Sequence, residues 1–113
     1  MEDLKKDAED NKIMGILAYL GILFLVPYLA AKESPFARFH ANQGCVLFIV
    51  EVAFYIVMAI LGVILPLGIY FLFSLLYFVC GLGILVLAIM GIINAVKGEM
   101  KELPIIGKYT ILK

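Results

Sequence analysis

One long stretch of almost uninterrupted apolar sequence, residues 44–96, dominates the pattern of this chain. It runs for 53 residues with a single formal charge, Glu51. A helix needs roughly 20 apolar residues to cross a hydrocarbon layer of about 30 Å, so the stretch is too long for one span and sufficient for two. Turn-forming residues fall together near its middle: Gly62, Pro66 and Gly68. The pattern predicts a helical hairpin with spans over 44–64 and 67–96.

A second apolar run, residues 13–31, contains 19 residues without a charge and is just long enough to cross as well. Small residues lie along one side of the expected helix, at Gly15, Ala18 and Gly21, and such surfaces let helices approach closely in lipid. Pro27 removes one backbone hydrogen bond, so we expect it to kink the helix or loosen its final turn. The predicted fold is an all-α integral membrane bundle of three transmembrane helices.

Polar segments frame these spans and complete the domain organisation. Residues 1–12 are dense in charge and form a polar N-terminal tail or short surface helix, while 13–113 form one membrane domain with a polar C-terminal tail, 97–113. Between the first two spans, Ser34 and Pro35 have the form of a helix start, with Ser as N-cap and Pro first in the helix. This connection is either a short amphipathic helix at headgroup level or an ordinary loop with aromatic anchors.

Composition supports the membrane assignment and excludes several classes of function. The chain is 65% hydrophobic with a mean hydropathy of +1.09, and a soluble domain of 113 residues could not bury that much apolar surface. The formal net charge is zero, so no nucleic-acid partner is expected. Cys45 and Cys80 lie in apolar sequence as small core residues, and the single histidine has no Cys/His cluster around it, so we expect no metal and no cofactor.

Glu51 is the residue that a membrane location makes costly. It lies seven positions after Gly44, about 10 Å along the helix. A carboxylate at that depth must be neutral, paired or facing water, which makes it a candidate functional residue. Tyr55, one turn further on, could donate a hydrogen bond to it, whereas His40 shares the face but lies about 16 Å away. A structural bond to a neighbouring helix and a proton- or substrate-handling role both remain open.

Small residues also recur along the third expected span. Gly81, Ala88 and Ala95 follow one another every seven residues, and Gly91 forms a small-xxx-small pair with Ala95. Such a stripe is typical of helix–helix packing, either within the monomer or between protomers. A continuous helix over this segment would measure about 45 Å, so it must tilt, protrude or break, and the Gly-Leu-Gly sequence at 81–83 is its weakest point.

The polar segments on either side of the hairpin carry a resemblance to a known family. The motif His40-Ala41-Asn42-Gln43-Gly44 precedes a span, and Ala95-Val96-Lys97-Gly98-Glu99 with Pro104 follows the last one. Both resemble a family of small prokaryotic membrane proteins that is distantly similar to the twenty-kilodalton subunit of the chloroplast inner-envelope import translocon. The resemblance covers about residues 13–113 and marks these family-like positions: His40, Asn42, Gln43, Gly98, Glu99 and Pro104.

That chloroplast subunit is regarded as a four-span channel component, whereas three spans are counted here. The family often has an aromatic residue before the tail proline, where this chain has Leu103. The resemblance therefore implies membership in the group and does not imply protein conduction.

Basic residues predict the orientation of a three-span protein. The N-terminal tail and the hairpin turn would share one side with three Lys, and the first loop and C-terminal tail would share the other with six Lys or Arg. Cytoplasmic segments carry the excess of Lys and Arg. We therefore expect a multi-pass protein of the plasma (inner) membrane, with its N-terminus outside and its C-terminus in the cytoplasm.

No catalytic constellation accompanies the candidate residues. His40, Glu51 and Glu99 have no nucleophile, paired carboxylate or metal cluster in the pattern around them, so we do not expect an enzyme. The leading hypothesis is an accessory or structural subunit of a translocation- or transport-related membrane assembly, in contact with the lipid bilayer and with other membrane subunits or copies of itself. The alternative is a small oligomeric proton- or ion-coupled transporter that uses Glu51.

Overall fold

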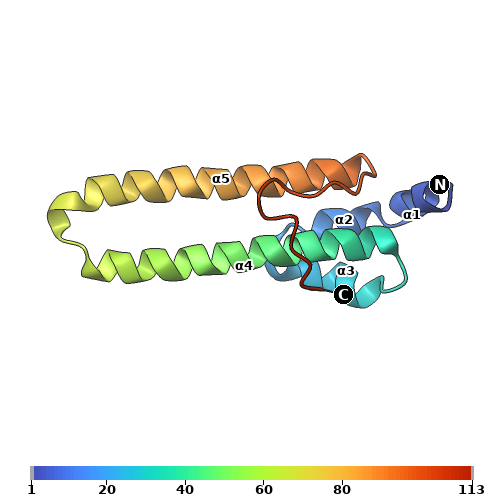
Figure 1. The fold of residues 1–113 in the computed structure, drawn as a ribbon, viewed down its shortest axis with the longest axis horizontal. Helices are drawn as coiled ribbons and strands as arrows, with labels where there is room; N and C mark the ends of the chain where they lie inside the picture. Colours follow the sequence, from blue (N-terminus) through green and yellow to red (C-terminus); the bar gives the residue numbers. More distant parts are fainter. Residues whose placement is uncertain (1, 113) are drawn as a thin grey trace.

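The structure is a long two-helix hairpin that carries a group of short helices at one end (Figure 1). The computed structural model describes residues 2–112. Its elements are α1 (Glu2–Asp10), α2 (Lys12–Leu17), η1 (Gly21–Phe24), α3 (Leu25–Ala30), α4 (Pro35–Ile64), η2 (Leu67–Ile69) and α5 (Tyr70–Val96). No strand occurs among these residues, which confirms the all-α class. The molecule measures 58 by 22 by 21 Å, and the hairpin sets its length.

Helices α4 and α5 are the two that are long and apolar enough to cross a membrane. Only 11% and 6% of the residues in their most apolar windows are buried. Large apolar side chains point outward along the hairpin, and Val63 and Phe71 expose 87% and 79% of their surface. Water would disfavour such a surface, whereas lipid tails match it, so the hairpin fits a bilayer.

The hairpin turns where the sequence predicted it. Helix α4 ends at Ile64, Pro66 follows, and the single turn η2 leads into α5. The Tyr70 hydroxyl donates a hydrogen bond to the Gly62 carbonyl and ties the two helix ends together. Helix α5 then runs without a break through residues 81–83, so the glycines there do not interrupt it.

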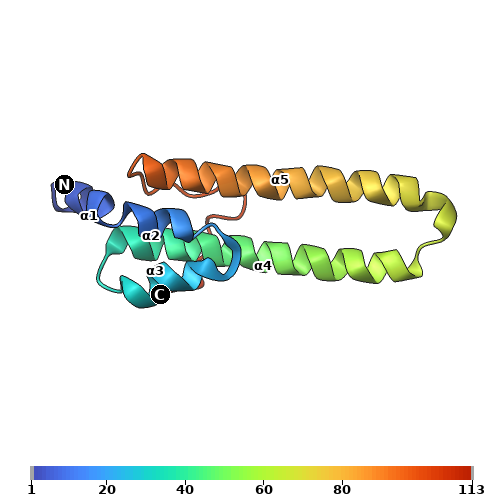
Figure 2. The same ribbon diagram turned by 180° about the vertical axis from the view of Figure 1, so that it is seen from behind.

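The prediction of a membrane span over residues 13–31 is wrong. Helices α2 and α3 have six residues each, about 9 Å of length, and the chain reverses direction between them (Figure 2). Gly21 causes the break because it adopts a φ of +63°, which a glycine takes without steric cost. Pro27 is the third residue of α3, where its missing N–H is not needed. Residues 2–112 therefore contain two membrane-length helices. The run at 13–31 forms two short helices packed on α4, called here the re-entrant pair because the chain turns back between them.

Two spans also change the expected topology, because both ends of the chain meet at the same end of the hairpin (Figure 1). The Asp7 carboxylate in α1 accepts hydrogen bonds from the Ser34 hydroxyl at 2.6 Å and the Phe36 N–H at 2.9 Å. A Cβ added at Gly98, just beyond α5, would lie 3.4 Å from Ala8. The placement of the two termini on opposite sides depended on three crossings, and the structure removes that basis.

The connection before the second predicted span is helical, and it belongs to α4 itself. The Ser34 hydroxyl accepts a hydrogen bond from the Ala37 N–H at 3.0 Å, and Pro35 is the first residue of the helix. The predicted helix start is thus confirmed, and the alternative prediction of an ordinary loop is wrong from Pro35 onward. Helix α4 continues from there to Ile64, so the headgroup-level helix and the span are one element.

The packed core lies at the end of the hairpin that carries the short helices. One cluster joins side chains from three segments: Ala18 and Tyr19 after α2, Leu47 of α4 and Leu103 of the C-terminal segment. A second cluster joins Ala8, Phe36 and Ala95. These members lie far apart in the sequence, so the first third of α4 is the element on which α1, α2, α5 and the C-terminal segment meet. We call this group of α1, α2, η1, α3 and residues 97–112 the cap.

Replacing Gly44 by Ala tests how tightly the cap closes on α4. A methyl group there would run into the backbone carbonyl of Ala18, which cannot move without separating the re-entrant pair from α4. We expect Gly44→Ala to destabilise the protein by about 1–3 kcal/mol, measured as a lower melting temperature in detergent micelles.

Gly81→Ala is the matched control, since nothing lies within 4 Å of a Cβ at that position. Alanine favours a helix over glycine by roughly 0.5–1 kcal/mol, so this variant should melt at the same temperature as the parent or higher. Equal melting temperatures for both variants would contradict the close contact.

Candidate functional site

The buried polar side chains gather at the start of α4. They are Ser34, His40, Asn42 and Gln43. Within residues 2–112, every buried side-chain nitrogen or oxygen has a hydrogen-bond partner. Three of the four belong to the motif that the sequence marked before the span, and the atoms they bind decide what the motif does.

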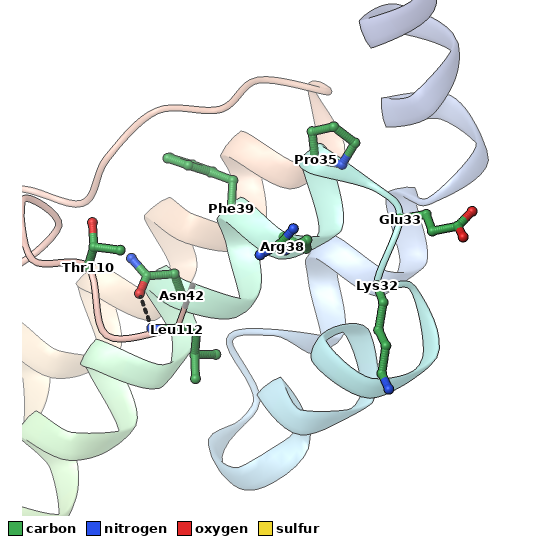
Figure 3. Close-up of a pocket in the computed structure, with 8 residues that line it drawn as sticks. All are labelled: Lys32, Glu33, Pro35, Arg38, Phe39, Asn42, Thr110 and Leu112. Atoms are coloured by element: carbon green, nitrogen blue, oxygen red, sulfur yellow. Dashed lines mark hydrogen bonds between the residues drawn. The ribbon is translucent and has the colours of Figure 1, made fainter.

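Asn42 binds the backbone of the last described residues. Its Nδ2 donates to the Tyr109 carbonyl at 2.9 Å. Its Oδ1 accepts from the N–H groups of Ile111 at 2.7 Å and Leu112 at 3.0 Å, the latter drawn in Figure 3. One amide side chain therefore satisfies three backbone groups of a segment that forms no helix or strand.

Gln43 holds both ends of a tight turn in the same segment. Its Nε2 donates to the Gly107 carbonyl at 2.8 Å, and its Oε1 accepts from the Leu103 N–H at 2.8 Å. The turn closes on itself through a bond from the Gly107 N–H to the Leu103 carbonyl at 3.0 Å. Pro104 lies inside this turn. A Cβ at Gly107 would collide with the Leu103 backbone and with Gln43, so the site requires glycine there.

His40 is fully buried and uses both ring nitrogens. Its Nε2 lies 2.9 Å from the Glu99 carbonyl, which can only accept, so Nε2 carries the hydrogen. Burial lowers the pKa of His40 to about 4 and so favours the neutral ring, in which Nδ1, 2.6 Å from the Tyr19 hydroxyl, accepts from it. The ring is neutral in this arrangement, and Phe36 and Phe39 pack edge-on against it at 4.6 and 5.1 Å between centroids. Neither nitrogen is free to act as a base or to bind a metal.

Together these three side chains fix residues 99–112 along α4 through six bonds to the backbone, three from Asn42, two from Gln43 and one from His40. We call His40, Asn42 and Gln43 the polar clasp. The family-like tail positions lie on the other side of the same contact. Gly98 leaves α5, Glu99 offers its carbonyl to His40 while its carboxylate pairs with Lys101 at 3.0 Å, and Pro104 shapes the turn.

Glu51 and Tyr55 are not part of the clasp. Glu51 is half-buried and lies in the part of α4 beyond the cap, where most side chains are exposed. Within residues 2–112 its carboxylate forms no hydrogen bond or ion pair. Tyr55 is 56% exposed and packs its ring against Phe54 and Tyr77 instead of reaching Glu51. The structure does not bring His40 and Glu51 together, because His40 is bound to Tyr19 and to the Glu99 carbonyl.

The small residues of α5 divide into a packed part and an open part. Gly91 lies against the Tyr19 ring, and Ala95 is fully buried beside Gly15. Ala88 is half-buried next to the core, whereas a Cβ at Gly81 would meet nothing within 4 Å. Within the monomer, the end of the stripe nearest the cap carries the helix contact, and the end nearest the turn is free.

The sequence pattern did not single out Tyr19 or Asp7, which complete the cap. Tyr19 sits in an apolar run, where its hydroxyl needs a partner, and that need was the available signal. Asp7 is one of several acids in the N-terminal segment, and nothing local distinguishes it. Within residues 2–112 no group of three or more His, Cys, Asp or Glu is placed to hold a metal ion.

Comparison with known proteins identifies relatives over nearly the whole chain. The model of a family described as the magnetosome magnetite crystal formation protein family matches residues 10–110. The magnetosome protein MamF of Paramagnetospirillum magneticum is 33% identical over 100 residues, which cover 88% of this chain and 82% of that protein. The magnetosome protein MmsF of the same organism is 29% identical over 94 residues, covering 83% and 79%.

A UPF0132 membrane protein of Methanocaldococcus jannaschii is 37% identical over 103 residues, covering 87% of this chain and 83% of that protein. No solved structure matches significantly. These comparisons confirm a family of small prokaryotic membrane proteins. They give no support to the expected similarity to the chloroplast translocon subunit.

Asn42→Ala tests the clasp. It removes three part-buried hydrogen bonds to the backbone of the C-terminal segment, and the net loss is about 0.5–1.5 kcal/mol for each bond. We expect the segment to detach and trypsin to cut after Lys108 at least several times faster than in the parent in detergent micelles.

Asn94→Ala is the matched control, because the Asn94 side chain makes one exposed hydrogen bond of 3.4 Å to the Lys101 carbonyl. Its cleavage rate should equal that of the parent. Unchanged cleavage in Asn42→Ala would show that the clasp does not hold the segment.

Proposed function

The chain belongs to the magnetosome magnetite crystal formation protein family, and from that premise we propose that it is a small structural subunit of a membrane assembly. In this proposal the α4–α5 hairpin is inserted in the bilayer and the cap lies at one membrane surface. The observation that carries it is the distribution of charge. All nine Lys and Arg lie before residue 39 or after residue 96, and the turn at 65–69 has none.

The length of α4 supports the same placement. From Gly44 to Ile64 it contains 21 residues, about 31 Å, which matches the thickness of the hydrocarbon layer. The membrane boundary then falls beside Gly44, directly below the polar clasp. An uncharged turn crosses at little cost, and the basic end remains in the cytoplasm. Both termini are therefore cytoplasmic in this proposal.

The way in which the polar side chains of the motif are used supports a structural role. Asn42 and Gln43 bond only to the chain's own backbone, and His40 bonds to the Glu99 carbonyl and the Tyr19 hydroxyl. The bare part of the hairpin offers apolar side chains and the open glycines Gly81 and Gly83, a surface that allows close approach of another helix in lipid. The named relatives are magnetosome and membrane proteins, which supports a place in a membrane assembly.

A second candidate, proton or ion transport by an oligomer, is favoured by one observation. The carboxylate of Glu51 lies on the bare half of α4 and has no hydrogen-bond partner within residues 2–112. A group of this kind inside a bilayer is stabilised by a partner helix or by water in a pathway. A structural subunit would therefore place a partner helix against Glu51, whereas a transporter would place water of a conduction pathway there.

Cysteine labelling tests the proposed topology. In a background of Cys45→Ala and Cys80→Ala, single cysteines at Lys5, Lys108 and Gly68 report the two ends and the turn. We expect Lys5→Cys and Lys108→Cys to react only when the cytoplasmic side is opened, and Gly68→Cys to react with an impermeant reagent from outside. Labelling of Lys5→Cys and Lys108→Cys from opposite sides would restore an odd number of crossings and contradict the proposal.

Two substitutions of Glu51 separate the candidates. Glu51→Gln keeps the shape and a hydrogen-bonding group, so a structural subunit should retain its oligomer on native gels, while Glu51→Leu should weaken it. A transporter should instead lose proton flux in liposomes with Glu51→Gln although the oligomer is intact. Retained oligomers in both variants, without any flux in the parent, would assign Glu51 to neither role.

A further inference from the structure

We propose that the groove between α3 and the start of α4 binds the phosphate headgroup of an anionic phospholipid, with Arg38 and Lys32 as the binding cations. This inference rests on the membrane orientation proposed above. The clasp residue Asn42 borders this groove, but its amide is already bonded to the backbone of residues 109–112, so the binding cations are different residues.

The groove is formed by two adjoining hollows that share both cations. One, of about 660 Å³, extends from Lys32 and Arg38 along α4 towards Asn42 and Leu112 (Figure 3). The other, of about 440 Å³, is lined by the same two cations with Tyr28 and Leu29 of α3. Lys32, in the connection between α3 and α4, and Arg38 of α4 therefore border both hollows.

The charges in this space favour an anion. Among the residues that line the groove, Glu33 is the one acid, and its carboxylate points away from Arg38 in Figure 3. Within residues 2–112 neither Lys32 nor Arg38 forms an ion pair. The planar fork of an arginine matches two phosphate oxygens, and Tyr28 also lines the second hollow.

The depth of the groove matches that of lipid phosphates. Arg38 precedes Gly44 by six residues, about 9 Å along the helix. The headgroup layer adds roughly 5–8 Å to each side of the hydrocarbon core, so a long arginine side chain at this position reaches the phosphates. Lys32, at the end of the re-entrant pair, lies at the same end of the molecule.

Exposed apolar side chains of α3 lie beside the groove. Leu29, which lines the second hollow, and Leu25 lie one turn apart on α3 and expose 58% and 37% of their surface. In a phospholipid whose phosphate is bound by the two cations, an acyl chain would contact these leucines, whereas free phosphate makes no such contact.

Native mass spectrometry of the protein in mild detergent tests this inference. Phosphatidylglycerol and phosphatidylcholine with identical acyl chains are the probes, and the variant is Lys32→Gln with Arg38→Gln. We expect the parent to retain phosphatidylglycerol preferentially. Each surface cation contributes about fivefold to the affinity for an anionic lipid, so the double variant should lose roughly 25-fold.

Lys5→Gln with Lys6→Gln removes the same charge from exposed positions of α1 and should bind as the parent does. If this control loses as much affinity for phosphatidylglycerol, the effect is general charge attraction and the proposed site is refuted. No preference for phosphatidylglycerol in the parent, or its displacement by millimolar inorganic phosphate, would overturn it too. Cysteine labelling of the same variants keeps the two proposals apart: correct labelling without lipid selectivity refutes only the lipid site.

Discussion

The structure depends on one requirement, that the backbone N–H and C=O groups of the irregular segment at 99–112 find hydrogen-bond partners beside the hairpin. Residues 99–112 form no helix or strand, and the turn bonds within the segment satisfy only some of its N–H and C=O groups. The amide side chains of Asn42 and Gln43 suit this need, because each carries donors and an acceptor on one planar group. A hydrophobic residue at either position would leave several backbone groups unpaired.

The rest of the cap is arranged around the same part of α4. Tyr19 fixes the ring of His40, and the re-entrant pair that carries Tyr19 packs against Gly44 by backbone contact. Asp7 attaches α1 to the first turn of the helix. These contacts bury the polar side chains in the first third of α4, whereas the remaining two thirds pack chiefly against α5 and are otherwise exposed.

Local pattern was sufficient to predict the hairpin and the start of α4. Length, hydropathy, the turn residues and the Ser34 cap are each encoded within a few positions. Residues 13–31 were misjudged because a continuous span and a re-entrant pair have the same length and hydropathy, and only the backbone at Gly21 separates them. The clasp residues were recognised, but their role was not, since their partners lie 59 to 70 residues away in the sequence.

That separation imposes an order on the making of the protein. A ribosome releases the clasp residues at 40–43 well before it finishes residues 103–112, and both halves of the hairpin must enter the membrane in the interval. Until residues 103–112 emerge, the amides of Asn42 and Gln43 lack these backbone partners, whereas Tyr19, the partner of the His40 ring, has already been made. The hairpin is therefore synthesised before the amide bonds of the clasp can form, and the C-terminal segment is fixed last.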